Sequence, residues 1–500
     1  MKAFCFTLTI LCAVQGILAY PRPDFAINGQ VSGSVTVKTT ATGLTDDINK
    51  VGNGTVTLNS GYQLLTKVKN ALEFIGDEVV RVAGPLGSSL NALAADTAGP
   101  INATYDGINT TITNIETLLV SGLNATIANI TTDTGIYIEK QFVDAFRSTK
   151  TTLVALRAAL DQLKSDVQKA KTAAGSANPI PSAIIRTYIP AKTVNAVITQ
   201  IRNLRARIPL ITYIIDSSLD NLKMVDIFII DMQKEVVRGA ATYVTSISGF
   251  QMNLEIENTD ITSKLTSNYG PSVSAVISSI KTELEANTDY NTVLQPKLTA
   301  LSGALESIVT ESAKINTSFT TYSSKVPLLI TNLNNSIASS LCEPIQTVSK
   351  VQIANGGFSD FCFSKYSPRV FSQVSLTIDA FDVCFEKEIM RLMNLAPIVQ
   401  RIATQISFNT ADLLSNLQVC LAISDLTSET NCLSTIAPYY TELAAKVTAH
   451  TATAIKLVDA ETKASYNRLG ACLFSSLSVT TVSATEISLE ATACLINGPE

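Results

Sequence analysis

The residues of this 500-residue chain best suited to covalent chemistry are its cysteines, and seven of the nine lie in the last third. Cysteines in an oxidising compartment usually form disulfides, whereas zinc-binding cysteines are clustered at short spacings. Here the successive spacings are 20, 22, 36, 12, 40 and 22 residues, with no Cys-x-x-Cys pair. The pattern therefore predicts disulfide formation and no metal site. The seven residues are Cys342, Cys362, Cys384, Cys420, Cys432, Cys472 and Cys494.

Six of these cysteines fit one antiparallel pair of helical arms. We expect one arm over about 358–423, a return arm over about 434–495, and a turn at Ala422–Asn431, which is rich in Ser, Thr, Asp and Asn. Facing residues in such a hairpin have residue numbers with a nearly constant sum. Two cysteine pairs sum to 856 and a third sums to 852. The three nested pairs are Cys362–Cys494, Cys384–Cys472 and Cys420–Cys432.

Rotational phase supports the same pairs. Cysteines on one arm are 22, 36, 40 and 22 residues apart, each close to a whole number of turns, so they share one side of a helix. A Cys362–Cys384 bridge within a straight helix is excluded, because about 33 Å would separate residues that a disulfide brings within about 7 Å. Six cysteines allow 15 pairings, so bonds to other neighbours remain the alternative. Pro368, Pro397 and Pro438 can each kink an arm.

Cys342 has no partner in this scheme, because 856 minus 342 lies beyond the end of the chain. Pro344 biases Glu343 away from helical geometry. We therefore expect Cys342 at a helix end, exposed, and either capped or joined to a second copy in a homodimer.

The cysteine order carries a resemblance to a known family. The segments "CFSKYSPRV…C" at 362–384 and "LQVC…NC" at 418–432, followed by Cys472 and Cys494, resemble the TsetseEP-domain family of insect secreted proteins. The likeness covers roughly Gly357–Gly498 and lacks the Glu-Pro repeat of the namesake. It implies an extracellular helical disulfide domain from a family linked to midgut and immune responses, with no established enzymatic activity.

The N-terminus predicts secretion. Lys2 precedes the apolar run Ala3–Ala19, which is shorter than a membrane span and ends at a small residue before "YPRPDF". These are features of a secretory signal peptide over residues 1–19; an uncleaved anchor is the alternative. We expect no other membrane span and a secreted, extracellular protein.

Residues 20–355 have a different character, with no cysteine before Cys342. We expect an extended or disordered segment over 20–60 and a Thr/Ser/Ala-rich region of long helices over 61–355, with breaks near 177–183 and at 268–272. Steps of three and four residues predict a coiled-coil-like helix. That stripe is Phe142, Phe146, Thr149, Leu153, Leu156, Leu160, Leu163 and Val167.

Seven Asn-x-Ser/Thr sequons predict N-glycosylation of a secreted chain, wherever the asparagine is exposed. Five of them lie between residues 53 and 129, and none lies after residue 357. The asparagines are Asn53, Asn102, Asn109, Asn124, Asn129, Asn316 and Asn334.

Catalytic constellations are sparse. The single histidine, His450, falls in a helical pattern, where it is more often a surface side chain than a general base. The segment "GPLGSS" at 84–89 lacks the Lys-Ser/Thr ending of a phosphate loop. A formal net charge of −5 does not favour nucleic acid. Arg202, Arg205 and Arg207 form a local cluster, which fits a solvated helix face ending at Pro209 better than an anion-binding patch. We predict no enzyme, no cofactor and no catalytic or metal site.

Together these patterns predict an all-α protein of elongated helical bundles with a C-terminal disulfide-stapled antiparallel helical hairpin, the cysteine-bearing domain covering 357–498. Two function classes fit. One is a secreted, non-enzymatic interaction or structural glycoprotein whose partner is a protein, a glycan or a microbial surface. The other is a carrier of lipid or another apolar ligand, because only 16% of residues are charged and amphipathic bundles can open an apolar core.

Overall fold

A computed structural model describes residues 24–267, 278 and 287–498. Within these residues every regular element is a helix, and the one strand-like feature is an isolated bridge between Asp24 and Ile27. The all-α expectation is confirmed. The signal peptide expected at 1–19 and the break expected at 268–272 lie outside the described residues.

The chain divides into two compact units. Unit 1 comprises Met1–Met232, Ile345–Ser367 and Leu489–Glu500, and unit 2 comprises Gln233–Pro344 and Pro368–Ser488. The expected domain 357–498 is thus not one compact unit. Its two ends belong to unit 1 and its middle to unit 2.

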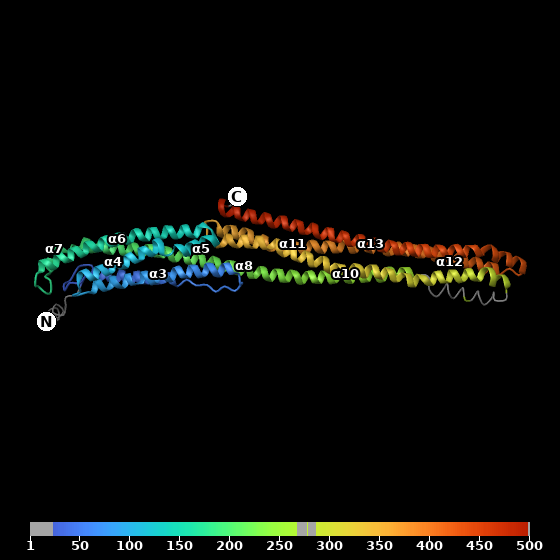
Figure 1. Ribbon diagram of the computed structural model, residues 1–500, viewed down its shortest axis with the longest axis horizontal. Helices are drawn as coiled ribbons and strands as arrows, with labels where there is room; N and C mark the ends of the chain where they lie inside the picture. Colours follow the sequence, from blue (N-terminus) through green and yellow to red (C-terminus); the bar gives the residue numbers. More distant parts are fainter. Residues whose placement is uncertain (1–23, 268–277, 279–286, 499–500) are drawn as a thin grey trace, which may run out of the picture. The chain divides into compact units, whose positions relative to one another are not determined.

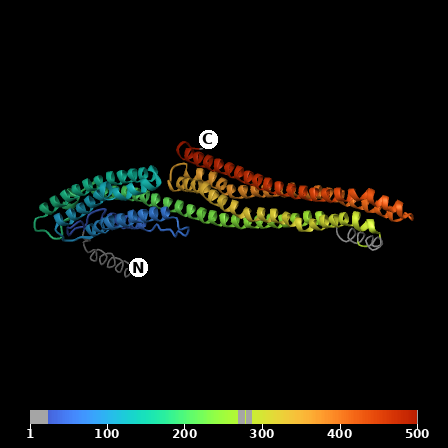
Figure 2. The same ribbon diagram turned by 45° about the vertical axis from the view of Figure 1, so that its right-hand side comes forward.

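Unit 1 is built mainly from helices that precede Met232, which lie side by side in Figures 1 and 2. A short π-helical turn, η2, joins α4 to α5. The elements are α2 (Ser34–Asn49), η1 (Lys50–Gly52), α3 (Gln63–Ala95), α4 (Ile101–Thr117), η2 (Leu118–Gly122), α5 (Asn124–Thr134), α6 (Ile136–Ala174), α7 (Ser182–Tyr188) and the first part of α8 (Ala191–Thr266).

The apolar stripe predicted for residues 142–167 is buried along one side of α6. Phe142, Leu153 and Leu163 have no exposed surface, and Thr149 fills the gap in the stripe at 1% exposure. The break predicted near 177–183 also occurs, since α6 ends at Ala174 and α7 begins at Ser182.

The extended or disordered segment expected over 20–60 is wrong for residues 34–49, which form α2. Val37, Leu44 and Ile48 of this helix are fully buried. The Thr40 hydroxyl donates to the carbonyl of Thr36, so this polar group is satisfied within the helix. Tertiary burial of an apolar stripe outweighed low local propensity.

Unit 2 contains the rest of α8 and the longest stretch of the hairpin. The elements are η3 (Tyr290–Leu294), α10 (Gln295–Ile353), α11 (Ser359–Met393), α12 (Leu395–Leu421) and α13 (Leu426–Asn497). The end of α10 after Pro344, the start of α11 up to Ser367 and the end of α13 from Leu489 belong to unit 1. Figures 1 and 2 show α13 running back beside α11 and α12.

The predicted hairpin is present with two corrections. The first arm is two helices, because α11 ends at Met393 and α12 starts at Leu395; Pro397 falls in the first turn of α12, where no backbone N–H is needed. The turn is shorter than expected, at 422–425. Asp425 accepts hydrogen bonds from the backbone and hydroxyl of Ser428, so this capping contact starts α13 early.

The hairpin shares its core with the second half of α8 and with α10. Tyr243 stacks on Phe381 at 5.3 Å between ring centroids, and Phe250 on Phe385 at 5.0 Å. These contacts belong to one continuous buried cluster that spans residues 243–477. A helical pair alone buries only one face of each helix, which explains why residue 357 is no boundary between compact units.

Candidate functional site

Three disulfides join the two arms of the hairpin, in the nested order of the constant-sum hypothesis. The Cα atoms of Cys362 and Cys494 are 5.9 Å apart, and those of Cys384 and Cys472 are also 5.9 Å apart. Cys420 and Cys432 close the hairpin end with a Cα separation of 5.6 Å. We call these three bonds the disulfide ladder.

Other contacts across the hairpin repeat the same register. The hydroxyls of Thr377 and Thr480, whose numbers sum to 857, lie 2.8 Å apart in a buried position. The Tyr440 hydroxyl donates to the carbonyl of Leu413 at 2.8 Å, a pair that sums to 853. The facing register is therefore maintained between the ladder positions as well as at them.

The expected place of Cys342 at a helix end is wrong. Cys342 lies inside α10, which continues through Pro327 and Pro344 to Ile353. Proline removes one backbone hydrogen bond, but apolar residues on both sides of it, including Leu341 and Val348, are buried and hold the helix together. The expected exposure is correct, and Cys342 takes no part in the ladder.

A buried carboxylate links α10, α11 and α13. Glu388 is 2% exposed and accepts hydrogen bonds from the Ser465 hydroxyl at 2.9 Å and the Arg468 guanidinium at 3.2 Å, with Arg391 as a further ion-pair partner. Ser465 in turn lies 3.1 Å from the Tyr322 hydroxyl. We call this group the Glu388 network.

The Glu388 network is arranged for structure. Burial lowers the pKa of the Arg468 guanidinium, but its hydrogen bonds to Glu461 and Glu388 outweigh burial, so the net pKa is raised and the cation is kept. Burial raises the pKa of the Tyr322 phenol. Two guanidinium groups and a hydroxyl hold the Glu388 carboxylate, and two of these three groups come from α13, so the network cross-links α11 and α13.

His450 lies on α13 and is partly exposed, beside the buried Thr451. The six ladder cysteines are all in disulfides, so they offer it no thiol nucleophile. In the part of the chain that the structure describes, no group of three or more His, Cys, Asp or Glu side chains could hold a metal ion.

One helix of those described, α13, is long and apolar enough to cross a membrane by length and composition. The qualifying 18-residue stretch has a mean hydropathy of 1.2, and one third of it is buried against the rest of the protein. A single such helix is weak evidence, because the core helix of a soluble protein has the same composition.

The sequons divide by exposure. Asn53, Asn102, Asn124 and Asn129 are exposed, whereas Asn109 is partly buried. The Asn109 amide donates to Asp161 at 2.9 Å, which engages the nitrogen that a glycan would need. In unit 2, Asn316 is exposed on α10 and accepts a hydrogen bond from Asn258, and Asn334 lies farther along the same helix.

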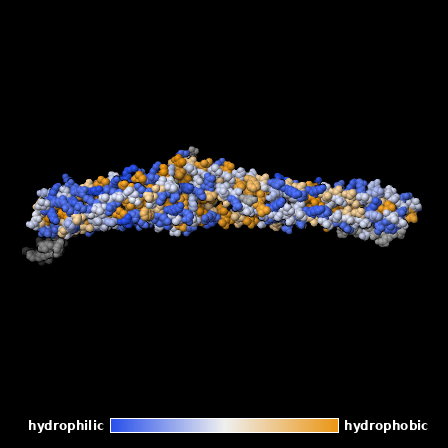
Figure 3. Space-filling model, viewed as in Figure 1, coloured by the Kyte–Doolittle hydropathy of each residue, from blue (hydrophilic) through white to orange (hydrophobic). Residues whose placement is uncertain are grey.

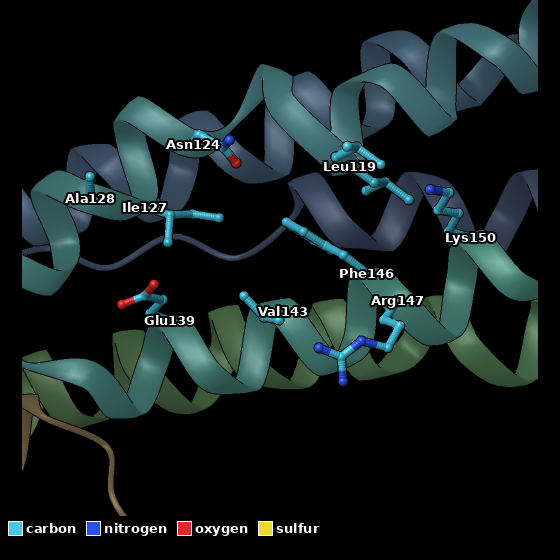
Figure 4. A pocket seen from close by; sticks show the side chains of 10 residues that line it. Leu119, Asn124, Ile127, Ala128, Glu139, Val143, Phe146, Arg147 and Lys150 are labelled. Carbon is cyan, nitrogen blue, oxygen red and sulfur yellow. The ribbon is translucent and has the colours of Figure 1, made fainter.

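A pocket of about 470 Å³ opens between η2, which follows α4, and helices α5 and α6 in unit 1 (Figure 4). Its floor is apolar, with Leu119, Ile127 and Phe146 each at least 90% buried. Val120 and Val143 line it and are exposed. The polar residues at its rim are Asn124, Glu139, Arg147 and Lys150. We call it the α4–α6 pocket; no sequence pattern indicated it, because its walls come from separate helices.

A polar junction at the end of α10 was also missed. Asn355 adopts a left-handed backbone with φ of 51°, and its side-chain amide bonds Ser217, Ser218 and Asn221 of α8. Its carbonyl accepts from Gln141 of α6 at 2.7 Å. The partners of Asn355 lie more than 130 residues away in the sequence, so no local pattern indicates them.

The arginine cluster is a helix face, as expected, although α8 continues past Pro209. Arg202 and Arg207 are exposed. Arg205 instead donates to Asp47 of α2 at 2.8 Å, so one of the three cations is engaged in an ion pair within unit 1.

Comparison with known proteins finds one family. Residues 359–476 match the family described as "Protein of unknown function (DUF725)", which covers most of the hairpin and two rungs of the disulfide ladder. No curated protein matches the chain. No solved structure matches it.

Proposed function

We propose that this chain is a secreted, non-enzymatic glycoprotein that acts as an interaction or structural module. The observation that carries the proposal is the disulfide ladder, because three bonds holding one helical hairpin suit a protein of an oxidising, extracellular compartment. A hairpin held by disulfides keeps its outer surface in one conformation, which lowers the entropic cost of binding a partner there.

The outer face of α11 supports an interaction role. Leu376, Val383 and Met390 recur every seven residues on the side away from the buried stripe, and their exposed fractions are 57%, 45% and 51%. Apolar residues at this spacing line one side of a helix. Figure 3 shows apolar residues interspersed with hydrophilic ones on the face in view. A partner protein, a glycan or a microbial surface would contact this apolar stripe of α11 and the hydrophilic residues around it.

The resemblance to the TsetseEP-domain family supports a more specific setting. That resemblance favours a role in the gut lumen or in the immune response of an insect. Exposed sequons near the N-terminus suit that setting, since glycans shield a chain from proteases. A disulfide-linked homodimer through the exposed Cys342 is part of the same proposal.

The test uses protein collected from the medium of insect cells that express the full chain with its own N-terminus. Arrays of bacterial surface glycans and chitin, together with intact bacteria, would be probed with wild type and with His450→Gln. Saturable binding that is equal in the two proteins and is lost on reduction supports the proposal. Hydrolysis of any array component that disappears in His450→Gln would overturn the non-enzymatic assignment.

A second candidate function is carriage of lipid or another apolar ligand. Exposed apolar residues in the charge-poor part of α13 favour it, among them Phe474, Val479 and Val482. The buried cluster of unit 2 is filled by side chains, so a ligand would require the helices to part. Native mass spectrometry of the secreted protein distinguishes the candidates, because a carrier would retain lipid that organic extraction releases.

A further inference from the structure

The α4–α6 pocket combines an apolar wall with hydrogen-bonding groups at its rim. Val120 and Val143 expose 51% and 40% of their surface beside the buried ring of Phe146. Glu139 offers an acceptor at one end, and Arg147 and Lys150 offer donors at the other (Figure 4). An occupant that matches both features has an apolar face and a hydroxyl-bearing edge.

The pocket also contains an attachment point for such an occupant. Asn124 is one of its lining residues, is exposed and begins the sequon Asn124-Ala125-Thr126. Figure 4 shows its amide on the helix that faces α6 across the pocket. An N-linked glycan begins with N-acetylglucosamine, whose ring has an apolar C–H face and whose hydroxyl and acetamide groups donate and accept hydrogen bonds.

Covalent attachment strengthens this match. A sugar tethered to Asn124 is held next to the pocket at a high effective concentration, so even weak contacts keep it bound. A volume of about 470 Å³ lies within the range of pockets that hold small ligands.

The neighbouring sequon provides a contrast. Asn129 lies on the same helix and is also exposed, but it does not line the pocket. Five residues along a helix turn the side chain by about 140°, so Asn129 is directed away from the side on which Asn124 lies. A glycan at Asn129 would extend into solvent.

We infer that the first sugar of an N-glycan on Asn124 lies in the α4–α6 pocket and covers its exposed valines. The inference rests on the proposed function, since it requires passage through the secretory pathway. It assigns to the N-terminal region an intramolecular glycan-binding site, in which the chain's own modification completes the apolar surface between α5 and α6.

The experiment uses secreted full-length protein from insect cells in which glycan processing is held at the high-mannose stage. Glycopeptide mass spectrometry measures occupancy of Asn124 and Asn129. An endoglycosidase that cleaves between the two core sugars then gives the release rate at each site, first for the native protein and then after denaturation.

The expected result is native release at Asn124 about tenfold slower than at Asn129, as for a sugar bound in its pocket about nine-tenths of the time. After denaturation the two rates should be equal. Val143→Glu places a like charge near Glu139 and fills the pocket, so it should remove the protection at Asn124 and leave Asn129 unchanged. Asn129→Gln is the matched control and should leave protection at Asn124 intact.

Equal native release rates at the two sites would overturn the inference, as would an unmodified Asn124 beside an occupied Asn129; both outcomes leave the proposed function standing. A protein with no occupied sequon would overturn the inference and the secreted-glycoprotein function together. A small amphipathic molecule retained equally by wild type and Asn124→Gln, seen by native mass spectrometry, would show that another ligand fills the pocket and would also overturn it.

Discussion

The N-terminal helices α2–α7 and the hairpin helices α11–α13 are kept in register by different kinds of contact. The N-terminal helices are joined by short connections and polar anchors, such as the bonds from Asn59 and Ser60 to Asp226. The hairpin aligns helices of up to 72 residues, whose apolar stripes would still meet after a slip of one turn. Disulfides make such a slip impossible. In the hairpin, the disulfides therefore fix a register that apolar packing alone leaves poorly defined.

The greatest loss of stability should follow removal of the outer rung of the disulfide ladder, Cys362–Cys494. Cys362→Ser combined with Cys494→Ser removes the rung of sequence separation 132. Because Cys384–Cys472 still bridges a separation of 88 inside it, the loop that opens is shorter, and loop-closure entropy predicts a loss of about 4 kcal/mol in the free energy of unfolding. Cys420→Ser combined with Cys432→Ser opens a separation of only 12, with a loss of about 3 kcal/mol. Urea denaturation of both double variants measures the order, and a larger loss at the inner rung would contradict it.

The next prediction concerns the Glu388 network, whose polar contacts should also stabilise the hairpin. Glu388→Gln removes the charge that Arg468 and Arg391 face, and the free energy of unfolding should fall by about 2 kcal/mol, less than for a fully buried pair because both arginines are partly exposed. Glu461→Gln is the control. Its side chain is 31% exposed and its loss should cost under about 1 kcal/mol. Equal losses of stability in the two variants would show that the Glu388 network does not stabilise the hairpin.

A third effect concerns the anchor of the N-terminal region. Burial raises the pKa of Asp226, but hydrogen bonds from the Ser60 hydroxyl and from the Asn59 and Ser60 amides outweigh it, and the net pKa is lowered. Its stabilising contribution is therefore present above the unfolded value of about 3.9 and is lost as pH falls through the lower folded value.

Asp226→Asn should accordingly destabilise the protein by about 1 kcal/mol at neutral pH and have a smaller effect under acid conditions. Denaturation curves measured from neutral pH down to about 3 check this. A loss of stability that does not depend on pH would show that the carboxylate charge is not what holds residues 59 and 60.

The smallest effect on stability is expected at Cys342, which is exposed and outside the ladder. Cys342→Ser should leave the free energy of unfolding within about 0.5 kcal/mol of wild type. On non-reducing electrophoresis it should abolish a dimer band that wild type shows. A monomer band for both proteins would end the homodimer proposal.

The sequence predicted what repeats along one helix and missed what joins distant helices. The stripe on α6 and the ladder positions followed from periodicity and from a numerical symmetry of facing residues. The helix over 34–49 was missed because its Thr-rich pattern has low helical propensity and because it is buried against a separate helix, α3. Glu388, Asn355 and the α4–α6 pocket depend on partners from separate helices, which no local pattern specifies.

A nested ladder of three disulfides holds the hairpin in one register. Peptide mapping under non-reducing conditions, on protein taken from the culture medium, tests it most directly. We expect to recover Cys362–Cys494, Cys384–Cys472 and Cys420–Cys432 as linked peptides. Recovery of a Cys362–Cys384 link, or of reduced thiols at the ladder positions in secreted protein, would contradict it.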